Sequence, residues 1–566
     1  MAAHDDPNVY APAVLKSRRR QMYFPLTDDE IARLRRFGEV RTYAPGEYLI
    51  HAGETGLGMF VILAGRVAVS RRDGLGHDLA MIPYRPRHFL AEVGQLSGRA
   101  SFVDAKAVGQ VEALAVPPEG LRGVVIAEAE LGERIMRALI LRRVGLIEAG
   151  AGGPVLIGPH DHPCVVELRN FLDRNAIPYR LLDPATEHEA DALLACVKPA
   201  PSDLPLVLCP DGTTLRHPTE HQLAERIGLL PKLDGKRVYD VAVVGAGPAG
   251  LATSVYAASE GLSVVVLETR AFGGQAGASA RIENYLGFPT GISGQALAGR
   301  AFSQAQKFGA EVVIPAAVRR LDCSRPGDYA LEMEDDSRIQ ARTVVIASGA
   351  AYRHPQAPGL EEAESGVHYW ASPVEGALCA RQEVALVGGG NSAGQAAVYL
   401  ASKAAKVWML VRGSGLEATM SKYLIDRIKA QKNIELLVHT EVSKLSVDHA
   451  GALEAVAWRD NKTGHESEHP IQHLFLFIGA DPCTSWLGDC ETAIDDKGFV
   501  LTGKPARPQD PSPLPLMTSL DGVFAIGDVR SGSTKRVAAA VGEGAAVVAQ
   551  IHGWLAGLRE AAETRA

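Results

Sequence analysis

A glycine-rich turn that follows a buried strand constrains the fold of this chain more than any other feature. The largely apolar residues 239–244 lead directly into Gly245-Ala246-Gly247-Pro248-Ala249-Gly250, and small residues continue in a helical pattern to Glu260. Residues 263–267 form a second apolar run, which ends at Glu268. A strand, a G-x-G-x-x-G turn, a helix, a strand and an acid in this order predict a Rossmann-type dinucleotide site.

Each glycine in this turn has a separate physical task. Gly245 permits the tight turn, Gly247 lets the backbone approach a pyrophosphate, and Gly250 lets the helix pack against the strand. The amides at the start of the helix, beside Pro248 and Ala249, provide donors and positive potential for phosphates. We expect Glu268 to accept hydrogen bonds from ribose hydroxyls, which selects an adenosine without a 2′-phosphate.

A second turn of this kind lies further along the chain. After an expected strand at 383–387, the next helix opens with the candidate residues Gly388, Gly390, Asn391, Ser392 and Ala393. The strand at 406–411 ends at Arg412, where an acid would favour NADH and an arginine suits the 2′-phosphate of NADPH. We expect NADPH, with Lys422 and Arg427 as helpers, and NADH stays open. Two turns predict FAD at the first and NAD(P) at the second, or one duplicated scaffold.

A third element lies near the end of the chain. An expected strand at 522–526 ends in Gly527-Asp528, and Lys535-Arg536-Val537 precede a helix of small residues at 538–549. We expect Asp528 to hold the ribityl hydroxyls of a flavin and residues 535–537 to lie beside its ring. The positive end of the helix would then stabilise a reduced, anionic flavin.

The stretch 238–560 resembles the low-molecular-weight thioredoxin reductase family. The resemblance rests on the three elements above and on Gly273-Gly274-Gln275, on residues 282–285, which include Asn284, and on residues 287–289. It implies that Gly274, Gln275 and Asn284 also contact FAD. It also implies an FAD-binding domain in two pieces, 237–351 and 468–560, an NAD(P)-binding domain at 352–467 that swings during turnover, and a homodimer.

The chain departs from this family at its redox centre. The family has a C-A-T-C motif, and Trp370 and Pro373 stand at its two cysteine positions here. The seven cysteines are widely spaced and none forms a C-x-x-C pair, which argues against a disulfide scaffold, a zinc site and a local dithiol. Only long-range pairing, such as Cys164 with Cys379, could replace the motif. Tyr369 and Trp370 are expected either to wall the flavin or simply to pack.

Residues 24–148 follow an N-terminal arm, 1–23, which we expect to be solvated. Short strands with glycine turns precede a helical pattern at 132–147, which predicts a small β-barrel with a helical tail. Residues 45–70 resemble the opening of a cyclic-nucleotide-binding domain. Glu92 matches the family's phosphate motif, but Ala91 replaces its glycine, Ser101 replaces its arginine, and Arg99 lies two residues early. We expect a barrel kept for packing or regulation, with cyclic-nucleotide binding doubtful.

Residues 154–232 follow a short glycine-rich joint. Their β-α-β-α-β-turn-α order resembles a thioredoxin/glutaredoxin-like domain, with Leu204-Pro205 where that family has a cis-proline. The redox motif is reduced to Asp161-His162-Pro163-Cys164. Cys164 is expected to be either an ordinary half-buried cysteine or a lone thiol whose pKa the helix dipole lowers. We interpret the module as a docking or spacer domain.

Composition narrows the function further. The net charge of −8 argues against nucleic-acid binding, and the sequence shows neither a membrane span nor a secretory signal, so we expect a cytoplasmic protein without a metal.

The fold class is multidomain: a β-barrel, a thioredoxin-like α/β domain and two Rossmann-like α/β domains. The expected function is an FAD-dependent NAD(P)H oxidoreductase that passes electrons directly to an unidentified acceptor. A flavin-based redox sensor coupled to the barrel and a flavoprotein scaffold without turnover are the alternatives.

Overall fold

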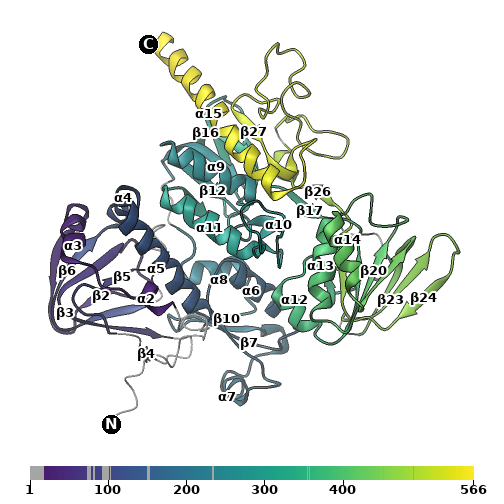
Figure 1. Ribbon diagram of the computed structural model, residues 1–566, viewed down its shortest axis with the longest axis horizontal. Helices are drawn as coiled ribbons and strands as arrows, with labels where there is room; N and C mark the ends of the chain where they lie inside the picture. The colour runs from purple at the N-terminus through teal and green to yellow at the C-terminus, as the bar shows by residue number, and fades with distance from the viewer. Residues whose placement is uncertain are drawn as a thin grey trace.

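The computed structural model describes residues 18–565 apart from 73–77, 81–82, 92–100, 102, 149–152, 232–234, 354, 356, 450 and 489. Figure 1 shows four folded units along the chain. The purple barrel lies at the left, a small sheet lies below the centre, a teal and yellow domain lies above it, and a green domain lies at the right. Among the described helices, none is both long and apolar enough to cross a membrane.

The N-terminal unit is the predicted barrel. Its strands are β1 (Glu39–Tyr43), β2 (Tyr48–Ile50), β3 (Met59–Arg72), β4 (Asp78–Ala80), β5 (Phe89–Leu90) and β6 (Asp104–Val116). The long antiparallel pair of β3 and β6 carries the other strands. Helices α3 (Asp28–Leu34), α4 (Pro118–Ala127) and α5 (Ala129–Glu148) close one side. Part of the expected arm is ordered, because α2 (Arg19–Met22) buries Met22 against Leu141 of α5.

The second unit has one four-stranded sheet. The chain runs β7 (Val155–Ile157), α6 (Pro163–Arg174), β8 (Arg180–Leu182), α7 (His188–Val197), β9 (Leu206–Leu208), β10 (Thr214–Arg216) and α8 (Glu220–Arg226). The sheet order is β10-β9-β7-β8, with β7 and β8 parallel and the other neighbours antiparallel. The sequence predicted every element except β10, which has only three residues. The Leu204–Pro205 peptide bond is cis, as the resemblance implied.

The third unit is built from two pieces of chain around a largely parallel sheet. Its sheet order is β13-β12-β11-β16-β15-β14, with β27 beside β16. The strands are β11 (Val238–Val244), β12 (Val264–Leu267), β13 (Glu311–Val313), β14 (Val318–Asp322), β15 (Tyr329–Met333), β16 (Arg338–Ile346) and β27 (Val523–Ala525). The helices are α9 (Pro248–Ser259), α10 (Gly274–Gly277), α11 (Gly294–Lys307) and α15 (Val537–Arg565). Because α15 packs along α9, the last part of the chain returns to the first turn.

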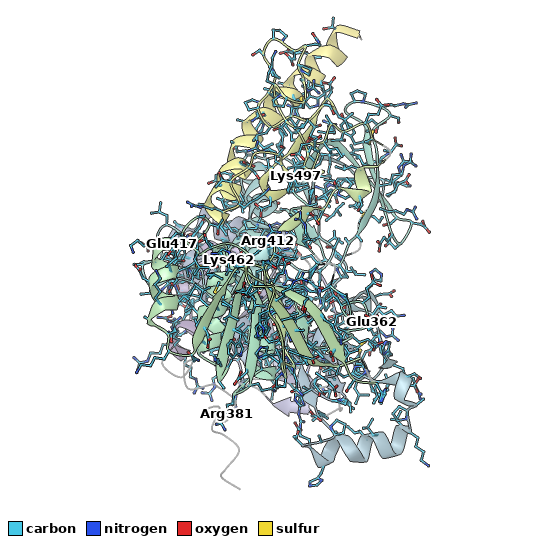
Figure 2. All side chains as sticks on the ribbon, turned by 90° about the vertical axis from the view of Figure 1, so that its right-hand side faces the viewer. Glu362, Arg381, Arg412, Glu417, Lys462 and Lys497 are labelled. Atoms are coloured by element: carbon cyan, nitrogen blue, oxygen red, sulfur yellow. A yellow bond between two sulfur atoms is a disulfide. The ribbon has the colours of Figure 1, made fainter. Side chains whose placement is uncertain are left out.

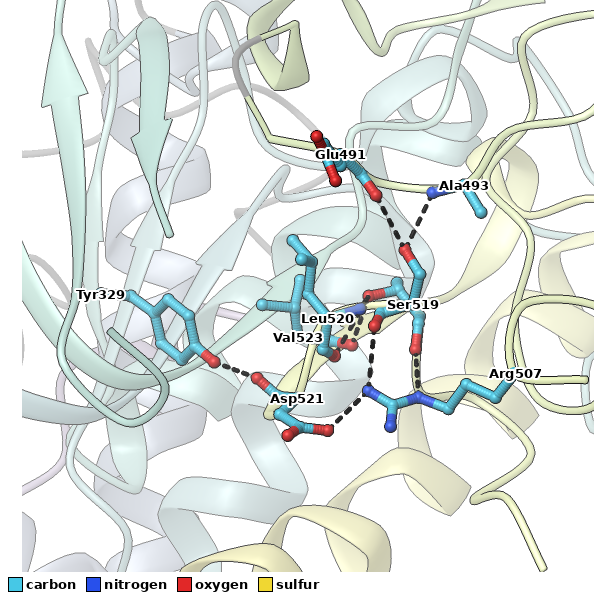
Figure 3. Close-up of polar contacts among 9 residues, drawn as sticks. Tyr329, Glu491, Ala493, Arg507, Ser519, Leu520, Asp521 and Val523 are labelled. Atoms are coloured by element: carbon cyan, nitrogen blue, oxygen red, sulfur yellow. Dashed lines mark hydrogen bonds and ion pairs between the residues drawn. The ribbon is translucent and has the colours of Figure 1, made fainter. Parts of the chain in front are cut away.

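Polar contacts hold the loop before β27 in place (Figure 3). Arg507 donates to the Thr518 carbonyl at 2.6 Å and pairs with Asp521 at 2.8 Å. The Tyr329 hydroxyl of β15 donates to the Asp521 carbonyl. This loop is therefore anchored to the sheet immediately before the strand that ends at Gly527.

The fourth unit carries a five-stranded parallel sheet in the order β18-β25-β19-β20-β21, beside an antiparallel sheet β22-β23-β24. Its strands are β18 (Val367–His368), β19 (Glu383–Val387), β20 (Lys406–Val411), β21 (Ile434–Val438), β22 (Thr440–Val447), β23 (Leu453–Asp460), β24 (Glu466–His469) and β25 (Leu474–Leu476). Its helices are α12 (Pro373–Leu378), α13 (Asn391–Ala401) and α14 (Lys422–Ala430). The expected domain boundary at 467 lies too early, because β25 pairs with β19 inside this sheet.

One cysteine pair corrects an expectation from spacing. Cys323 and Cys490 form a disulfide although 167 positions separate them in the chain. Cys323 follows β14 and Cys490 follows the 3-10 turn Ser485–Leu487, which packs against β14. The sequence argument excluded local pairs only, and the fold closes a long-range pair that differs from the Cys164–Cys379 example.

Candidate functional site

The first glycine turn has the geometry that its sequence predicts. Gly245 has a φ of 108°, and a Cβ there would stand 2.3 Å from the Ala347 carbonyl oxygen. A Cβ on Gly250 would stand 1.9 Å from the Gly245 oxygen. Helix α9 therefore begins tightly against β11, with Gly247 as its N-cap, Pro248 in its first turn and Ala249 buried.

Gly247 differs from its neighbours because the space beside it is open. A Cβ on Gly247 would have only the Gly274 Cα near it, at 4.0 Å. Gly274 belongs to the Gly273-Gly274-Gln275 motif, and the Gly273 amide donates to the Ala246 carbonyl at 2.7 Å. Two glycine backbones therefore face each other at a helix N-terminus, as a pyrophosphate cradle requires. Gln275 lies just beyond, where its side chain donates to the Ala350 carbonyl, and Asn284 lies exposed in the loop after α10.

Glu268 lies at the end of β12 beside the same turn. Its Oε2 accepts the Ala246 amide at 2.7 Å, and its Oε1 accepts the Arg270 amide at 3.1 Å. The carboxylate is thus held at the rim of the cradle, where a ribose would lie.

The C-terminal element also reaches this turn. A Cβ on Gly527, whose φ is 71°, would stand 2.9 Å from the Ala249 Cβ. Asp528 follows directly, and burial raises the pKa of its carboxyl. Among the described residues, none donates a hydrogen bond to the Asp528 carboxylate. The Lys535 ammonium donates instead to the main-chain carbonyl of Asp528. Arg536 is exposed at the start of α15, which begins at Val537. A half-buried carboxylate with spare acceptors fits a polyhydroxyl chain.

The second turn repeats the first. Gly388 has a φ of 143°, and its Cβ would stand 2.5 Å from the Phe477 oxygen, whereas Gly390 is the N-cap of α13 with open space beside it. The Asn391 side chain accepts the Ser421 amide at 2.8 Å, which ties the turn to the loop before α14. Ser392 is exposed and Ala393 is buried under the helix.

Three basic side chains gather where β20 ends. The His439 amide donates to the Gly413 carbonyl at 2.9 Å, and the Asn461 amide donates to the His439 carbonyl at 2.7 Å. The backbone segments that carry Arg412, His439 and Lys462 are therefore neighbours. Figure 2 shows the labelled Arg412 and Lys462 at the upper ends of the green strands. Sequence reasoning found Arg412 only, because about 50 residues separate the three positions and no local motif joins them. Lys422 and Arg427, the expected helpers, are paired with Asp426 and Glu283.

A pocket lies between the two turns. Gln275 and Tyr352 line it from one side and Trp370, Ser392 and Phe477 from the other. Burial raises the pKa of the Tyr352 hydroxyl, an interaction with Ser392 lowers it, and the charge of Asp528 raises it further. The two candidate sites are therefore neighbours, and Trp370 forms part of the wall between them.

The segment around Trp370 has no thiol chemistry. Pro373 opens α12, and Ser372 and Glu375 form its capping box. Tyr369 packs in the apolar cluster of the fourth unit instead of lining the pocket. Cys379 is fully buried, and burial raises the pKa of its thiol to about 11.

The two N-terminal units hold weaker candidates. Glu92 and Arg99 lie outside the described residues. Ser101 is buried, and its hydroxyl is engaged with Val103 in its own turn. Cys164 lies 3.5 Å from His217 Nε2, and burial raises the pKa of its thiol. This favours the ordinary half-buried cysteine over the lone thiol with a lowered pKa. In the described part of the chain, no three His, Cys, Asp or Glu side chains are grouped as metal ligands would be.

Two parts of the chain match models of known protein families. Residues 239–544 match the family model described as pyridine nucleotide-disulphide oxidoreductase. The chain belongs to that family. Residues 40–127 match the cyclic nucleotide-binding domain model.

The relatives are thioredoxin reductases. The chain is 34% identical to that of Mycolicibacterium smegmatis over 322 residues, which are 56% of this chain and 97% of the relative. It is 30% identical to that of Bacillus subtilis over 330 residues, covering 98% of the relative. The Lactococcus lactis enzyme in its FR conformation superposes with a TM-score of 0.52 at 27% identity, covering 56% of this chain and 99% of that one. The chain is thus an FAD-dependent NAD(P)H oxidoreductase of the thioredoxin reductase type, with a cyclic-nucleotide-binding-type barrel at its N-terminus.

Proposed function

We propose that this oxidoreductase passes electrons from NADPH through FAD directly to an acceptor, without a redox dithiol. The observation that carries the proposal is the wall of the pocket between the two glycine turns. Trp370 stands there in place of the first cysteine of the family motif, and Pro373 replaces the second inside α12. The nearest cysteine in sequence, Cys379, is fully buried with a raised pKa, so it is a poor redox group.

We propose that the first turn and the C-terminal element hold FAD. The residues we assign are Gly245, Gly247, Pro248, Ala249, Gly250, Glu268, Gly274, Gln275, Asn284, Gly527, Asp528, Lys535, Arg536 and Val537. The open cradle between Gly247 and Gly274 supports this assignment, because a side chain there would fill the space that a pyrophosphate needs. The unpaired carboxylate of Asp528 supports it at the ribityl end. When bound, the flavin supplies the two-electron chemistry, and the chain supplies position and charge.

We propose that the second turn holds NADPH through Gly388, Gly390, Asn391, Ser392, Ala393 and Arg412. The gathering of Arg412, His439 and Lys462 supports NADPH over NADH, because a 2′-phosphate carries close to two negative charges. In the described structure neither Arg412 nor Lys462 has an acidic partner, so both cations are available to a ligand.

The acceptor is the open chemical question. Quinones, iron–sulfur or flavin carriers, dioxygen and small oxidants all accept electrons from reduced flavins. The test is an anaerobic screen in which NADPH-reduced enzyme is mixed with quinones, ferredoxin, flavodoxin, oxygen and thioredoxin. Rapid reoxidation by one of the first four with slow reoxidation by thioredoxin supports the proposal. Efficient reduction of thioredoxin contradicts it.

A second candidate function is a flavin-based sensor coupled to the barrel. Met136, Ile140 and Leu141 of α5 line a pocket together with Arg300 of α11, so the barrel's last helix meets the flavin domain. Deleting residues 1–148 distinguishes the sensor from the simple oxidoreductase. If the shortened protein keeps the native rate of flavin reduction and the native binding partners, the barrel is not coupled to the flavin.

Two further assignments complete the proposal. The sheet order β10-β9-β7-β8 and the cis Leu204–Pro205 bond support a thioredoxin-like second unit that serves in docking. A homodimer is proposed from the resemblance, and sedimentation should then give about twice the 60.1 kDa of the chain.

A further inference from the structure

A slender link joins the two nucleotide domains. Strands β17 (Ala350–Tyr352) and β26 (Ala480–Pro482) form a two-stranded antiparallel ribbon between them. Gly349 and Gly479 stand at its ends with positive φ of 70° and 105°, and neither has a neighbour near its Cβ position. Such a ribbon bends easily, so other contacts must fix how the domains face each other.

Helix α6 of the second unit contacts the nicotinamide domain at its middle. Asn170 is 3% exposed and donates its Nδ2 to Glu375 Oε1 at 2.8 Å. The Ser372 hydroxyl lies 3.3 Å from Asn170 Oδ1. Glu375 itself is 1% exposed. A buried carboxylate of α12 therefore receives a hydrogen bond from a different domain.

The end of the same helix contacts the flavin domain. Arg174 donates to the Gly274 carbonyl at 2.8 Å, beside the cradle. Asn175 donates to the Arg270 carbonyl at 2.9 Å. Gln295 of α11 donates to the carbonyls of Asp173 and Arg174, each at 3.0 Å. One helix thus binds both nucleotide domains within two turns of its length.

The same contacts determine where Trp370 lies. Its indole Nε1 donates to Glu375 Oε1 at 3.0 Å, the oxygen that also accepts from Asn170. The Arg270 guanidinium stands 5.2 Å from the ring centroid and pairs with Glu220 of α8 at 2.8 Å. The indole that walls the pocket is therefore held by groups from the second unit as well as by its own domain.

We propose that the second unit is a clamp on the reductase, and that Asn170 is a positioning residue for hydride transfer. Asn170 acts through Glu375 on Trp370, and α6 as a whole holds the two nucleotide domains in the orientation that brings the nicotinamide to the flavin. In the step that it serves, NADPH gives a hydride, with its two electrons, to the flavin and leaves as NADP⁺. The inference rests on the proposed placement of the two cofactors.

The clamp predicts that a substitution at Asn170 lowers the rate of flavin reduction but leaves the affinity for NADPH nearly unchanged. Asn170→Ala removes one donor from the buried carboxylate and loosens α12, while every residue assigned to NADPH is left in place. The rate of flavin reduction at saturating NADPH should fall between about tenfold and a hundredfold, because a small misplacement of reacting groups has that effect. The dissociation constant for NADPH should change less than about twofold.

In a second variant the rate of flavin reduction should depend on pH, which a purely structural role of Asn170 would not explain. Asn170→Asp keeps the shape of the side chain but places a second carboxylate against Glu375. When one of the two carboxyl groups is protonated, it can donate to the other, and the hydrogen bond between α6 and α12 is restored. Its rate of flavin reduction should rise as pH falls from 8 to 6, relative to the native enzyme. The other titratable and charged groups that face Glu375 or the end of α6 are common to both proteins: Asp173, Arg174, Arg169, Tyr179, Tyr399, Cys379, Arg270, Glu268 and Glu220.

The experiment is stopped-flow reduction of full-length, FAD-loaded enzyme by NADPH, with hydrogen exchange measured at residues 349–352 and 479–482. Glu225→Ala, on the exposed side of α8 in the same unit, is the matched control and should behave as the native enzyme. Faster exchange at the link together with the lower rate in the Asn170 variants supports the clamp. Native rates and native exchange in both variants overturn it, as does fast exchange at the link in the native enzyme. A native enzyme that NADPH does not reduce would instead refute the proposed function.

Discussion

Gly247 and Gly390 both have open space beside them, so substituting either should weaken cofactor binding without disturbing the fold. Gly247→Ala adds a methyl group whose nearest atom is 4.0 Å away, so the fold should survive while the pyrophosphate loses its space. We expect purified protein with at least about tenfold weaker FAD binding and native circular dichroism. Absorbance near 450 nm per chain measures it. Gly299→Ala, which also has open surroundings but lies in α11, is the control and should stay yellow.

Gly390→Ala makes the same change at the second turn. A Cβ there meets no protein atom within 4 Å, so FAD content should be native. The KM for NADPH should rise about tenfold or more, because the methyl group occupies the phosphate position at the start of α13. Steady-state kinetics with an artificial acceptor measure this. A variant that loses FAD while keeping its KM for NADPH would show that the two turns were assigned in the wrong order.

We propose that Arg412 and Lys462 make the enzyme prefer NADPH to NADH, and this assignment predicts a change in nucleotide preference. Replacing either with Gln removes a cation from the 2′-phosphate, and kcat/KM with NADPH should fall about tenfold or more while kcat/KM with NADH changes little. Lys422→Gln is the matched control, since Lys422 is paired with Asp426 at 3.1 Å. An equal loss with both nucleotides in the Arg412 variant would contradict the assignment.

At the scale of the element, α6 contains an acid that opposes folding at neutral pH. Burial raises the pKa of Asp173 to about 6, and the groups that face it are Tyr179, Arg169 and Glu375. The unfolded chain loses this proton near pH 4 and the folded chain only near pH 6, so stability falls as pH rises through that window and is level above it. The cost is bounded by about 3 kcal/mol above pH 6.

Asp173→Asn should therefore raise the melting temperature at pH 8 and leave it unchanged near pH 4. Thermal unfolding of the full chain at the two pH values checks this, with Glu225→Gln on the exposed side of α8 as the control. A gain of equal size at both pH values would mean that ionisation of Asp173 is not the cause.

Sequence patterns predicted most elements because each has a local signal. The strand, glycine turn and helix of both nucleotide sites begin within one or two residues of their expected positions, since caps and apolar runs are local. β10 was missed because three residues show no periodicity, and β25 was placed in the wrong domain because strand pairing is not local. Cys323–Cys490, His439 beside Arg412, and Asn170 beside Glu375 were missed because each joins distant parts of the chain.

For the whole molecule, the flavin and nicotinamide domains meet at one pocket, and the other two units contact these domains. The flavin and nicotinamide domains supply the two turns, the second unit binds both through α6, and the barrel reaches the flavin domain through α5. In this arrangement Ser372 and Glu375, beside Trp370, contact Asn170 of the second unit.

An anaerobic titration of the purified enzyme with NADPH, combined with a count of free thiols, tests the central claim most directly. Our account predicts that one NADPH per FAD bleaches the flavin completely and that the thiol count does not change. Uptake of a second NADPH with two new thiols, whether from Cys323–Cys490 or from another pair, would contradict it, because electrons would then pass from the flavin to a disulfide after all.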